Sequence, residues 1–309
     1  MKVLGIGNAI IDVICKVEEK FISENNLSKG NMKLIFDGNE LKKLLSNLKI
    51  EKTISGGSVA NSIVGLSQQG NEVGFIGKVA DDEFGEKYET GLKQEKVEYI
   101  YQKKKEVLPT GTCLILVTPD SERTMCTFLG IAGKINEYDI NLKAIKKSEI
   151  IFLEGYLWDK GDPQKAFDKA INNSNKIAMT LSDKFCVDRH KSHFLDLVKN
   201  KIDITFANEE EMKSLIDAKK FNEVIEFSKQ TKKTIVITKG AEGAISIKDN
   251  EICKIEAKKN LSIKDLTGAG DLFASGYLDG YLNNLSQEKC LKKGTDMSSK
   301  IIQQIGARL

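Results

Sequence analysis

The chain has 309 residues, of which 40% are hydrophobic and 29% charged, enough to bury a large core. Its 47 basic and 44 acidic residues are mixed along the sequence and leave a formal net charge of +3, too small for a surface that binds nucleic acid or membranes. Six cysteines without a CxxC pair favour reduced thiols in the core over disulfides or a zinc site. With no signal-peptide pattern and no apolar run of membrane-spanning length, we expect a cytoplasmic protein.

The first strongly patterned segment, Val3–Gly7, has the apolar character of a buried strand that ends in a tight turn. Asn8 follows this turn, and Asp12 interrupts the apolar run that comes next. A carboxylate at this place has two interpretations, either as a turn residue or as an acceptor of hydrogen bonds from sugar hydroxyls.

A glycine pair, Gly56 and Gly57, stands directly before a helical pattern that stops at Gly70. Adjacent glycines let a ligand approach the backbone closely. Asn61, one turn into the helix, can both donate and accept hydrogen bonds, as a pair of vicinal hydroxyls requires. A helix cap with an incidental Asn explains the pattern equally well.

Short alternating strands are predicted between Tyr99 and Phe128, with a turn at Pro119–Ser121. Together with the segment from residue 12 to 36, they would form a small sheet that projects from the main body. Such a sheet can act as a lid, formed from about 12–36 and 99–128, that shuts water out of a reaction. Arg123, beside the turn, is interpreted either as an exposed side chain or as a group that meets a phosphate.

Strands and helices alternate regularly beyond Glu137, as a parallel sheet requires. Polar groups that follow the strands should gather at one edge of that sheet, where ligands bind. His190 and His193 share a helix face without a third metal ligand, so we interpret them as surface residues. The predicted strands are 150–153, 176–181, 202–206 and 234–238, and the predicted helices are 163–172, 189–199, 209–215 and 221–231.

Asn208 and Glu211 stand at a predicted helix start, where an amide and a carboxylate can hold a hydrated magnesium ion through its waters. A helix cap with an acidic first turn explains the same residues without metal. The run Thr238–Gly243 lies between two strands, and its glycines can shape a loop that lines a nucleotide. A P-loop enzyme is not expected, because no GxxxxGK[ST] motif is present.

The most informative run is Asp265–Asp271, a Gly-Ala-Gly turn that leads into an amphipathic helix. Backbone N–H groups at a helix start favour anions, and we expect phosphate as the ligand. Asp271 lies in the first helical turn, where its carboxylate could take a proton from an acceptor hydroxyl. A glycine-rich turn with an acidic helix start is the alternative.

Several motifs in the right order together resemble the PfkB-type, ribokinase-like kinases, and among them the adenosine kinases, over nearly the whole chain. DLTGAGD at 265–271 is similar to the C-terminal signature of the family, Gly77–Gly85 resembles its N-terminal signature, and 208–211 fits its NxxE motif. Asn8 with Asp12, Gly57 with Asn61, 109–113, and 181–185 resemble adenosine kinases in particular. The resemblance implies a single domain over 1–309, a three-layer α/β/α fold with a mostly parallel central sheet and a small β lid.

The resemblance also implies roles for individual residues. Asp271 would be the catalytic base, Gly268, Ala269 and Gly270 the anion hole, and Arg123 a lid residue beside the transferred phosphate. Asn208 and Glu211 would order Mg²⁺ through water, with ATP as co-substrate. The implied acceptor-binding residues are Asn8, Asp12, Gly56, Gly57, Ser58, Asn61, Tyr156 and Phe185. The implied ATP-binding residues are Asn208, Thr238, Lys239, Gly240, Gly243 and Thr267.

The sequence departs from the family pattern at Ala80, Leu266 and Met32, of which Met32 bears on nucleobase preference. A monovalent cation site is doubtful, because the sequence stops soon after Gly306. We expect transfer of the ATP γ-phosphoryl group to the 5′-hydroxyl of a ribonucleoside, above all adenosine. The alternatives are a sugar kinase acting on fructose, ribose or a related sugar, and a nucleoside-binding regulator without kinase activity. The expected assembly is a monomer or a homodimer formed through the lid.

Overall fold

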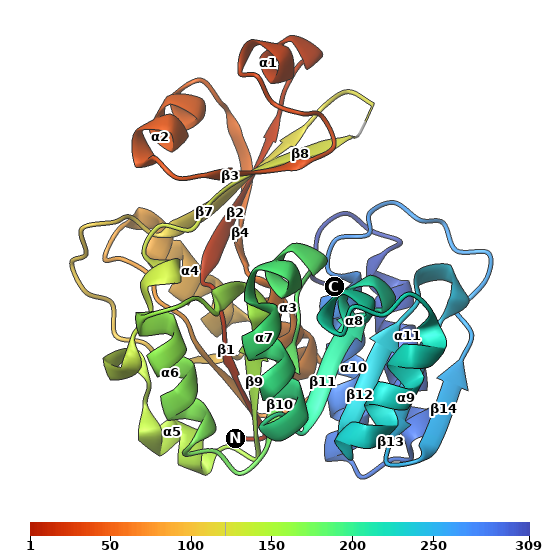
Figure 1. Ribbon diagram of the computed structural model, residues 1–309. Coiled ribbons are helices and arrows are strands. Elements are labelled where there is room, and N and C mark those ends of the chain that lie inside the picture. Colours follow the sequence, from red (N-terminus) through yellow and green to blue (C-terminus); the bar gives the residue numbers. More distant parts are fainter. Residues whose placement is uncertain (121) are drawn as a thin grey trace.

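The computed structural model describes residues 1–120 and 122–309, which form two sheets of unequal size (Figure 1). The larger sheet contains β1 (Val3–Ile6), β5 (Val73–Ile76), β6 (Glu98–Tyr99), β9 (Ile150–Glu154), β10 (Ile177–Thr180), β11 (Ile204–Asn208), β12 (Thr234–Thr238), β13 (Ala244–Lys248) and β14 (Glu251–Ile255). Their order is β14-β13-β12-β11-β10-β9-β1-β5-β6. Among the described strands of this sheet, antiparallel pairing is confined to β12 with β13 and β13 with β14, so the prediction of a mostly parallel sheet is confirmed.

Helices cover both faces of the larger sheet. One face carries α3 (Ser58–Gln68), α4 (Glu83–Gln94), α10 (Ala269–Leu282) and α11 (Gln287–Ile301), and the other carries α5 (Leu142–Lys147), α6 (Asp162–Ile171), α7 (Lys184–Asn200), α8 (Glu209–Leu215) and α9 (Phe221–Thr231). Neighbouring side chains of β1 alternate between the two layers, since Val3 lies in one apolar cluster and Leu4 in the other. The predicted three-layer α/β/α architecture is therefore confirmed.

The smaller sheet projects from the main body (Figure 1). It has the strand order β3-β8-β7-β2-β4. Its outer face is covered by two helices, whose Ile22 and Leu44 pack in the same apolar cluster as Val13 and Leu116 of the sheet. Its elements are β2 (Ile10–Lys16), α1 (Glu19–Glu24), β3 (Met32–Ile35), α2 (Gly38–Ser46), β4 (Ile50–Gly56), β7 (Gly111–Val117) and β8 (Arg123–Phe128).

The composition of the smaller sheet differs from the prediction in two respects. The elements α2 and β4 were not anticipated, and β6 pairs with β5 in the larger sheet instead of joining the projecting one. β4 is mostly exposed along its first half, so its residues lack the alternation that marks a strand in sequence. The predicted turn Pro119–Ser121 includes Ser121, which lies outside the described residues.

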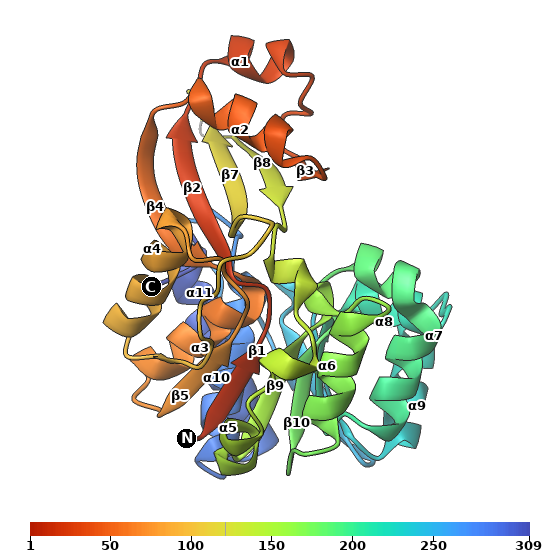
Figure 2. The same ribbon diagram turned by 90° about the vertical axis from the view of Figure 1, so that its left-hand side faces the viewer.

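Chain continuity links the two sheets, because β1 runs on into β2 with only residues 7–9 between them (Figure 2). Short 3-10 helices connect other elements: η1 (Ala132–Lys134), η2 (Glu137–Asp139), η3 (Gly155–Leu157) and η4 (Gly240–Glu242). All six cysteines are free, and five of them are buried, as predicted for core thiols.

One prediction on α7 was wrong. His190 is buried and not on the surface, because the rings of His190 and His193 pack on Trp158, with centroids 4.5 and 4.1 Å away. The helix also begins at Lys184, five residues earlier than predicted, and its backbone leaves helical geometry at His190 (φ −121°, ψ 21°). A tertiary partner that is distant in sequence thus explains the two histidines.

Candidate active site

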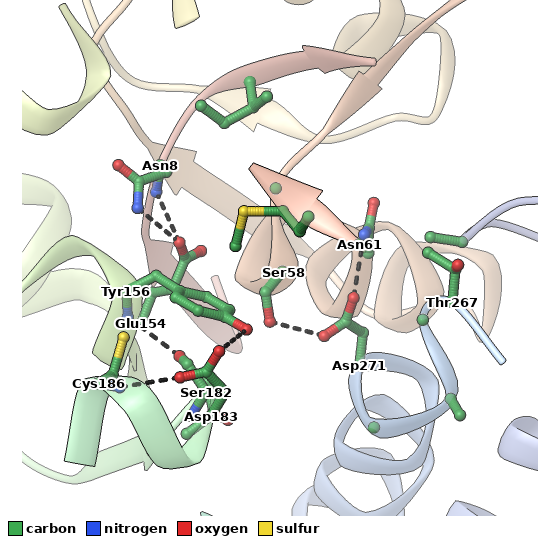
Figure 3. A pocket seen from close by; sticks show the side chains of 18 of the residues that line it. Asn8, Ser58, Asn61, Glu154, Tyr156, Ser182, Asp183, Cys186, Thr267 and Asp271 are labelled. Carbon is green, nitrogen blue, oxygen red and sulfur yellow. Dashed lines mark hydrogen bonds between the residues drawn. The ribbon is translucent and has the colours of Figure 1, made fainter. Parts of the chain in front are cut away.

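A cleft of about 710 Å³ lies between the smaller sheet and the carboxyl ends of the parallel strands, within the size range of small-molecule sites. Groups from both halves of the chain line it (Figure 3). The predicted site residues among its lining are Asn8, Asp12, Gly57, Ser58, Asn61, Tyr156, Phe185, Asn208, Glu211, Thr238, Thr267, Gly268, Ala269, Gly270 and Asp271. The predicted residues outside this lining are Gly56, Arg123, Lys239, Gly240 and Gly243.

Asp271, at the start of α10, contacts side chains at the start of α3 (Figure 3). Its Oδ1 accepts a hydrogen bond from Ser58 Oγ at 2.6 Å, and its Oδ2 accepts one from Asn61 Nδ2 at 3.0 Å. Burial raises the pKa of Asp271 to about 6, although these two donors and the charge of Arg308 act in the opposite direction. The carboxylate is therefore ionised at neutral pH and is a stronger proton acceptor than an ordinary Asp.

The glycine turn before Asp271 has the geometry of an anion site. Gly268 adopts a left-handed conformation (φ +78°), which ends the preceding loop and starts α10 at Ala269. A Cβ on Gly270 would meet no heavy atom within 4 Å, so the backbone there is open to a ligand. N–H groups at the start of this 14-residue helix have no intrahelical acceptor and favour a phosphate.

Glu154 joins two segments that line the cleft. Asn8 Nδ2 donates to Glu154 Oε1 at 2.9 Å (Figure 3). Val59 N donates to Glu154 Oε2 at 3.0 Å. The Glu154 side chain is buried, and Asn8 Oδ1 accepts no hydrogen bond within the described part of the chain. The end of β9 thus orients Asn8 and the first turn of α3 through a single carboxylate.

Gly57 is required by its surroundings. Its φ of +102° lies in the region that disfavours side chains, and a Cβ there would meet the backbone oxygen of Asn8 at 2.2 Å. Its neighbour Gly56 packs against Asp12, whose carboxylate would lie 2.5 Å from a Cβ added at residue 56. The two glycines bring Asn8, Asp12 and the start of α3 close to one another.

Arg123 does not line the cleft. Its Nη1 lies 2.5 Å from Asp265 Oδ2, in an ion pair that joins β8 of the smaller sheet to the loop before α10. Asp265 also accepts hydrogen bonds from Thr267 N, Thr267 Oγ1 and Gly306 N. A role for Arg123 at a transferred phosphate therefore requires that its guanidinium leave Asp265.

Asn208 and Glu211 line the cleft at the start of α8. They form a reciprocal capping box at the start of α8, in which Asn208 N and Nδ2 donate to Glu211 and Glu211 N donates to Asn208 Oδ1. No group of three or more His, Cys, Asp or Glu side chains in 1–120 and 122–309 is arranged to hold a metal ion directly. Glu211 retains lone pairs beyond these two bonds, so the pair fits a hydrated ion held through water.

The loop after β12 is shaped by its own contacts. Thr238 lines the cleft, whereas Lys239 Nζ pairs with Glu242 at 2.6 Å and with Glu209 at 3.3 Å. Gly240 and Gly243 bracket this turn, both with positive φ. Lys239 thus stabilises the loop in this structure and does not face the cleft.

Glu154 and Arg308, which bond to site residues, were given no role from the sequence. Glu154 directly follows a predicted strand, so its place at the edge where ligands gather could be predicted, but its bonds to Asn8 and Val59 could not. Arg308, whose Nε donates to Asn61 Oδ1 at 3.1 Å, carries no such signal in sequence. Its position depends on a contact between residues 247 apart.

Buried carboxylates give the first testable prediction. Burial raises the pKa of Asp12, Glu154 and Glu211 to about 7, and that of Asp271 to about 6, from ordinary values of 3.8 for Asp and 4.5 for Glu. Between those ordinary and raised values the folded protein binds more protons than the unfolded chain, so its stability falls as pH rises. We expect the free energy of unfolding in urea to be lower at pH 8 than at pH 5.5, by roughly 1 kcal/mol or more.

The matched variant for this prediction is Glu211→Gln, which removes one of these titrating groups and should reduce the decline between the two pH values. A free energy of unfolding that increases from pH 5.5 to pH 8 would contradict the raised pKa values.

The chain is similar to known proteins over nearly its whole length. The model of the pfkB family of carbohydrate kinases matches residues 2–309. The crystal structure of adenosine kinase from Sinorhizobium meliloti is 34% identical, with a TM-score of 0.90 over 100% of this chain and 95% of that one. A probable sugar kinase from Rhizobium etli CFN 42 is 35% identical, with a TM-score of 0.88 over 99% and 94% of the two chains. Adenosine kinase of Dictyostelium discoideum is 29% identical over 330 residues, which cover 99% of this chain and 96% of that protein.

Membrane crossing has no support in the structure, because no helix within the described ranges is both long and apolar enough for it. The family match extends over nearly the whole chain, and the relatives are covered almost completely. The chain belongs to the PfkB family of carbohydrate kinases, which are ATP-dependent enzymes.

Proposed function

We propose that this kinase transfers the γ-phosphoryl group of ATP to the 5′-hydroxyl of a ribonucleoside, above all adenosine. The observation that carries the proposal is the meeting of Asp271 with Asn8, Asp12 and Asn61 in one cleft that also has an apolar roof. A proton acceptor, polar groups suited to sugar hydroxyls and an apolar surface for a base are the three features that a nucleoside acceptor needs.

Asp271 serves as the general base in this proposal. Its carboxylate takes the proton from the acceptor hydroxyl as that oxygen forms its bond to the γ-phosphorus and the bond to the β-phosphate oxygen of ATP breaks. The N–H groups around Gly268 and Gly270 stabilise the negative charge on the phosphoryl oxygens. Mg²⁺, held through water beside Asn208 and Glu211, supplies further charge neutralisation when it is bound.

The roof of the cleft favours a nucleoside over a free sugar. It is the inner face of the smaller sheet, where Ile10, Cys113 and Ile115 form an apolar cluster with Met125 against it. Tyr156 and Phe185 lie on the opposite side, and Phe185 is 61% exposed. A purine ring would bury these apolar surfaces, and each Å² of apolar area removed from water stabilises binding by about 25 cal/mol. A sugar offers little apolar area to cover them.

A lid role for the smaller sheet belongs to the same proposal. The sheet supplies the roof, so its approach to the main body would exclude water from the transferring phosphate. We propose that the protein is a monomer, because α1 and α2 already cover the outer face through which two such sheets could otherwise pack. The edges β3 and β4 remain the alternative surfaces for a homodimer through the lid.

The second candidate is a sugar kinase. It is favoured by the similarity to the probable sugar kinase of Rhizobium etli and by the polar groups Asp12 and Asn61, which suit the hydroxyls of any such ring. The similarity to adenosine kinases of Sinorhizobium meliloti and Dictyostelium discoideum supports the nucleoside instead. A nucleoside-binding regulator is disfavoured, since a binder has no need of a base at the start of a phosphate-binding helix.

The test compares adenosine, inosine, ribose and fructose as acceptors by measuring ADP release and the phosphorylated product. We expect kcat/KM for adenosine to exceed that for ribose by at least about 10²-fold, because the base buries the apolar roof. In an Ile115→Asn variant the KM for adenosine should rise, while any turnover of ribose stays unchanged.

The control variant is Lys52→Ser on the exposed half of β4, which should alter neither value. Efficient turnover of a free sugar with none of adenosine would contradict the nucleoside assignment and leave the sugar kinase.

A further inference from the structure

Arg308 lies behind the base and not in the substrate cleft. Arg308 lines a neighbouring hollow of about 500 Å³ and is not among the residues that line the cleft. Its Nε donates to Asn61 Oδ1 at 3.1 Å, and Asn61 Nδ2 in turn donates to Asp271 Oδ2 at 3.0 Å. A continuous path of hydrogen bonds therefore joins Arg308 to the carboxylate at the start of α10.

The direction of this path is fixed by chemistry. A guanidinium can only donate, so the Asn61 atom that faces Arg308 must be the amide oxygen. The amide nitrogen is then the atom that faces Asp271, and it suits the ionised carboxylate, which can only accept. If the amide turned over, two oxygens would meet at Asp271 and two donors at Arg308.

The backbone at Arg308 and Leu309 is bonded to two glutamine side chains, and several titratable groups surround the guanidinium. The backbone oxygen of Arg308 accepts from Gln304 Nε2 at 2.7 Å, and that of Leu309 accepts from Gln68 Nε2 at 3.2 Å. The charged or titratable groups that face Arg308 are Asp12 from β2, Tyr88 from α4, Glu95 after α4 and Asp271 from α10. Glu154 of β9 and Tyr156 after it also face Asp271.

We propose that Arg308 is a positioning residue for phosphoryl transfer, which fixes the Asn61 amide so that Asp271 is held ionised and aimed at the acceptor hydroxyl. The inference rests on the proposed role of Asp271 as the base. Its consequence is that loss of the guanidinium should reduce proton acceptance most at the pH where Asp271 is only partly ionised. The charge of Arg308 lowers the pKa of both Asp271 and Asp12, against the effect of burial.

The experiment measures kcat and KM from pH 5.5 to pH 9 for the wild type, Arg308→Gln, Arg308→Lys and Asp271→Asn, with ATP and whichever acceptor the wild type phosphorylates. In Arg308→Gln the pKa of Asp271 should rise, so kcat should fall by roughly 10-fold at pH 6 and by less than about 2-fold at pH 9. Arg308→Lys keeps the charge and should restore the wild-type pH profile. The charge of Arg308 also acts on Asp12, a proposed acceptor-binding residue. Weaker acceptor binding in Arg308→Gln would therefore appear as a higher KM and not as a lower kcat.

A second control is Gln304→Ala, which removes the bond to the backbone of Arg308 but keeps its guanidinium, and should keep the wild-type profile. A loss of kcat in Arg308→Gln that is equal at all pH values would overturn the inference, because a structural role alone gives that result. If Asp271→Asn retains normal kcat, the base and the inference both fail. If Asp271→Asn is inactive while Arg308→Gln matches the wild type, only the inference fails.

Discussion

An Asp271→Asn enzyme is expected to lose on the order of 10²-fold to 10⁴-fold or more in kcat while it still binds ATP. The amide keeps the size of the carboxylate but cannot take the proton from the acceptor hydroxyl. Ser58 and Asn61 both donate to Asp271 in this structure. In Asp271→Asn the new side-chain NH₂ would therefore face a hydrogen-bond donor instead of pairing with it. Steady-state turnover and calorimetric titration with ATP measure the two parts of this expectation.

The matched control for Asp271→Asn is Asp296→Asn on α11, where the carboxylate pairs with Lys258 away from the cleft. That variant should retain the wild-type kcat. Turnover of the Asp271→Asn enzyme within about 3-fold of the wild type would remove Asp271 from the role of base, since general base catalysis contributes at least about 10²-fold.

Loss of Glu154 should have the largest effect on stability. In Glu154→Ala the N–H groups of Asn8, both backbone and side chain, and of Val59 lose their buried acceptor. We expect a decrease of about 3–5 kcal/mol in the free energy of unfolding, because each buried donor without a partner costs about 1–3 kcal/mol. Urea unfolding followed by circular dichroism measures this decrease. The KM for the acceptor should also rise, since Asn8 is no longer oriented.

Two control variants show whether the loss in Glu154→Ala comes from its buried hydrogen bonds. Glu154→Gln keeps the side-chain volume and one acceptor oxygen, so its loss should be smaller. Glu149→Ala removes an exposed carboxylate paired with Lys2 and should cost less than about 1 kcal/mol. A decrease below about 1 kcal/mol for Glu154→Ala would show that Glu154 does not stabilise the two segments that it joins.

Segments with regular patterns were predictable from the sequence. The predicted helices 209–215 and 221–231 have the same bounds as α8 and α9. A capping box begins α8, and α9 was marked by the helical spacing of its apolar residues, without a side-chain cap. β4 and α2 escaped prediction, since their stability comes from pairing with β2 and from packing on the projecting sheet. Burial of His190 under Trp158 is equally a property of the assembled molecule.

The site follows the same division. Groups that end parallel strands or begin glycine-led helices could be assigned to one edge of the sheet, and Asp271 and Asn61 were found in this way. Which of these groups bind one another could not be predicted. The bond from Asn61 to Asp271 joins residues 210 apart, and that from Asn8 to Glu154 joins residues 146 apart. Such pairs depend on distances that only the packed core sets.

The link between the two sheets has a consequence for how the enzyme loads its substrates. Asn8 lies in the short connection from β1 to β2, and Gly57 lies between β4 and α3. If the smaller sheet acts as the proposed lid, its outward movement would have to bend the backbone at these joints, as hinge rotation does at the ends of elements. On this proposal, opening of the cleft would displace Asn8 and Gly57, and closure would bring them back to the positions seen in this structure. Such an enzyme should waste little ATP on water, because the catalytic geometry and the closed state arise together.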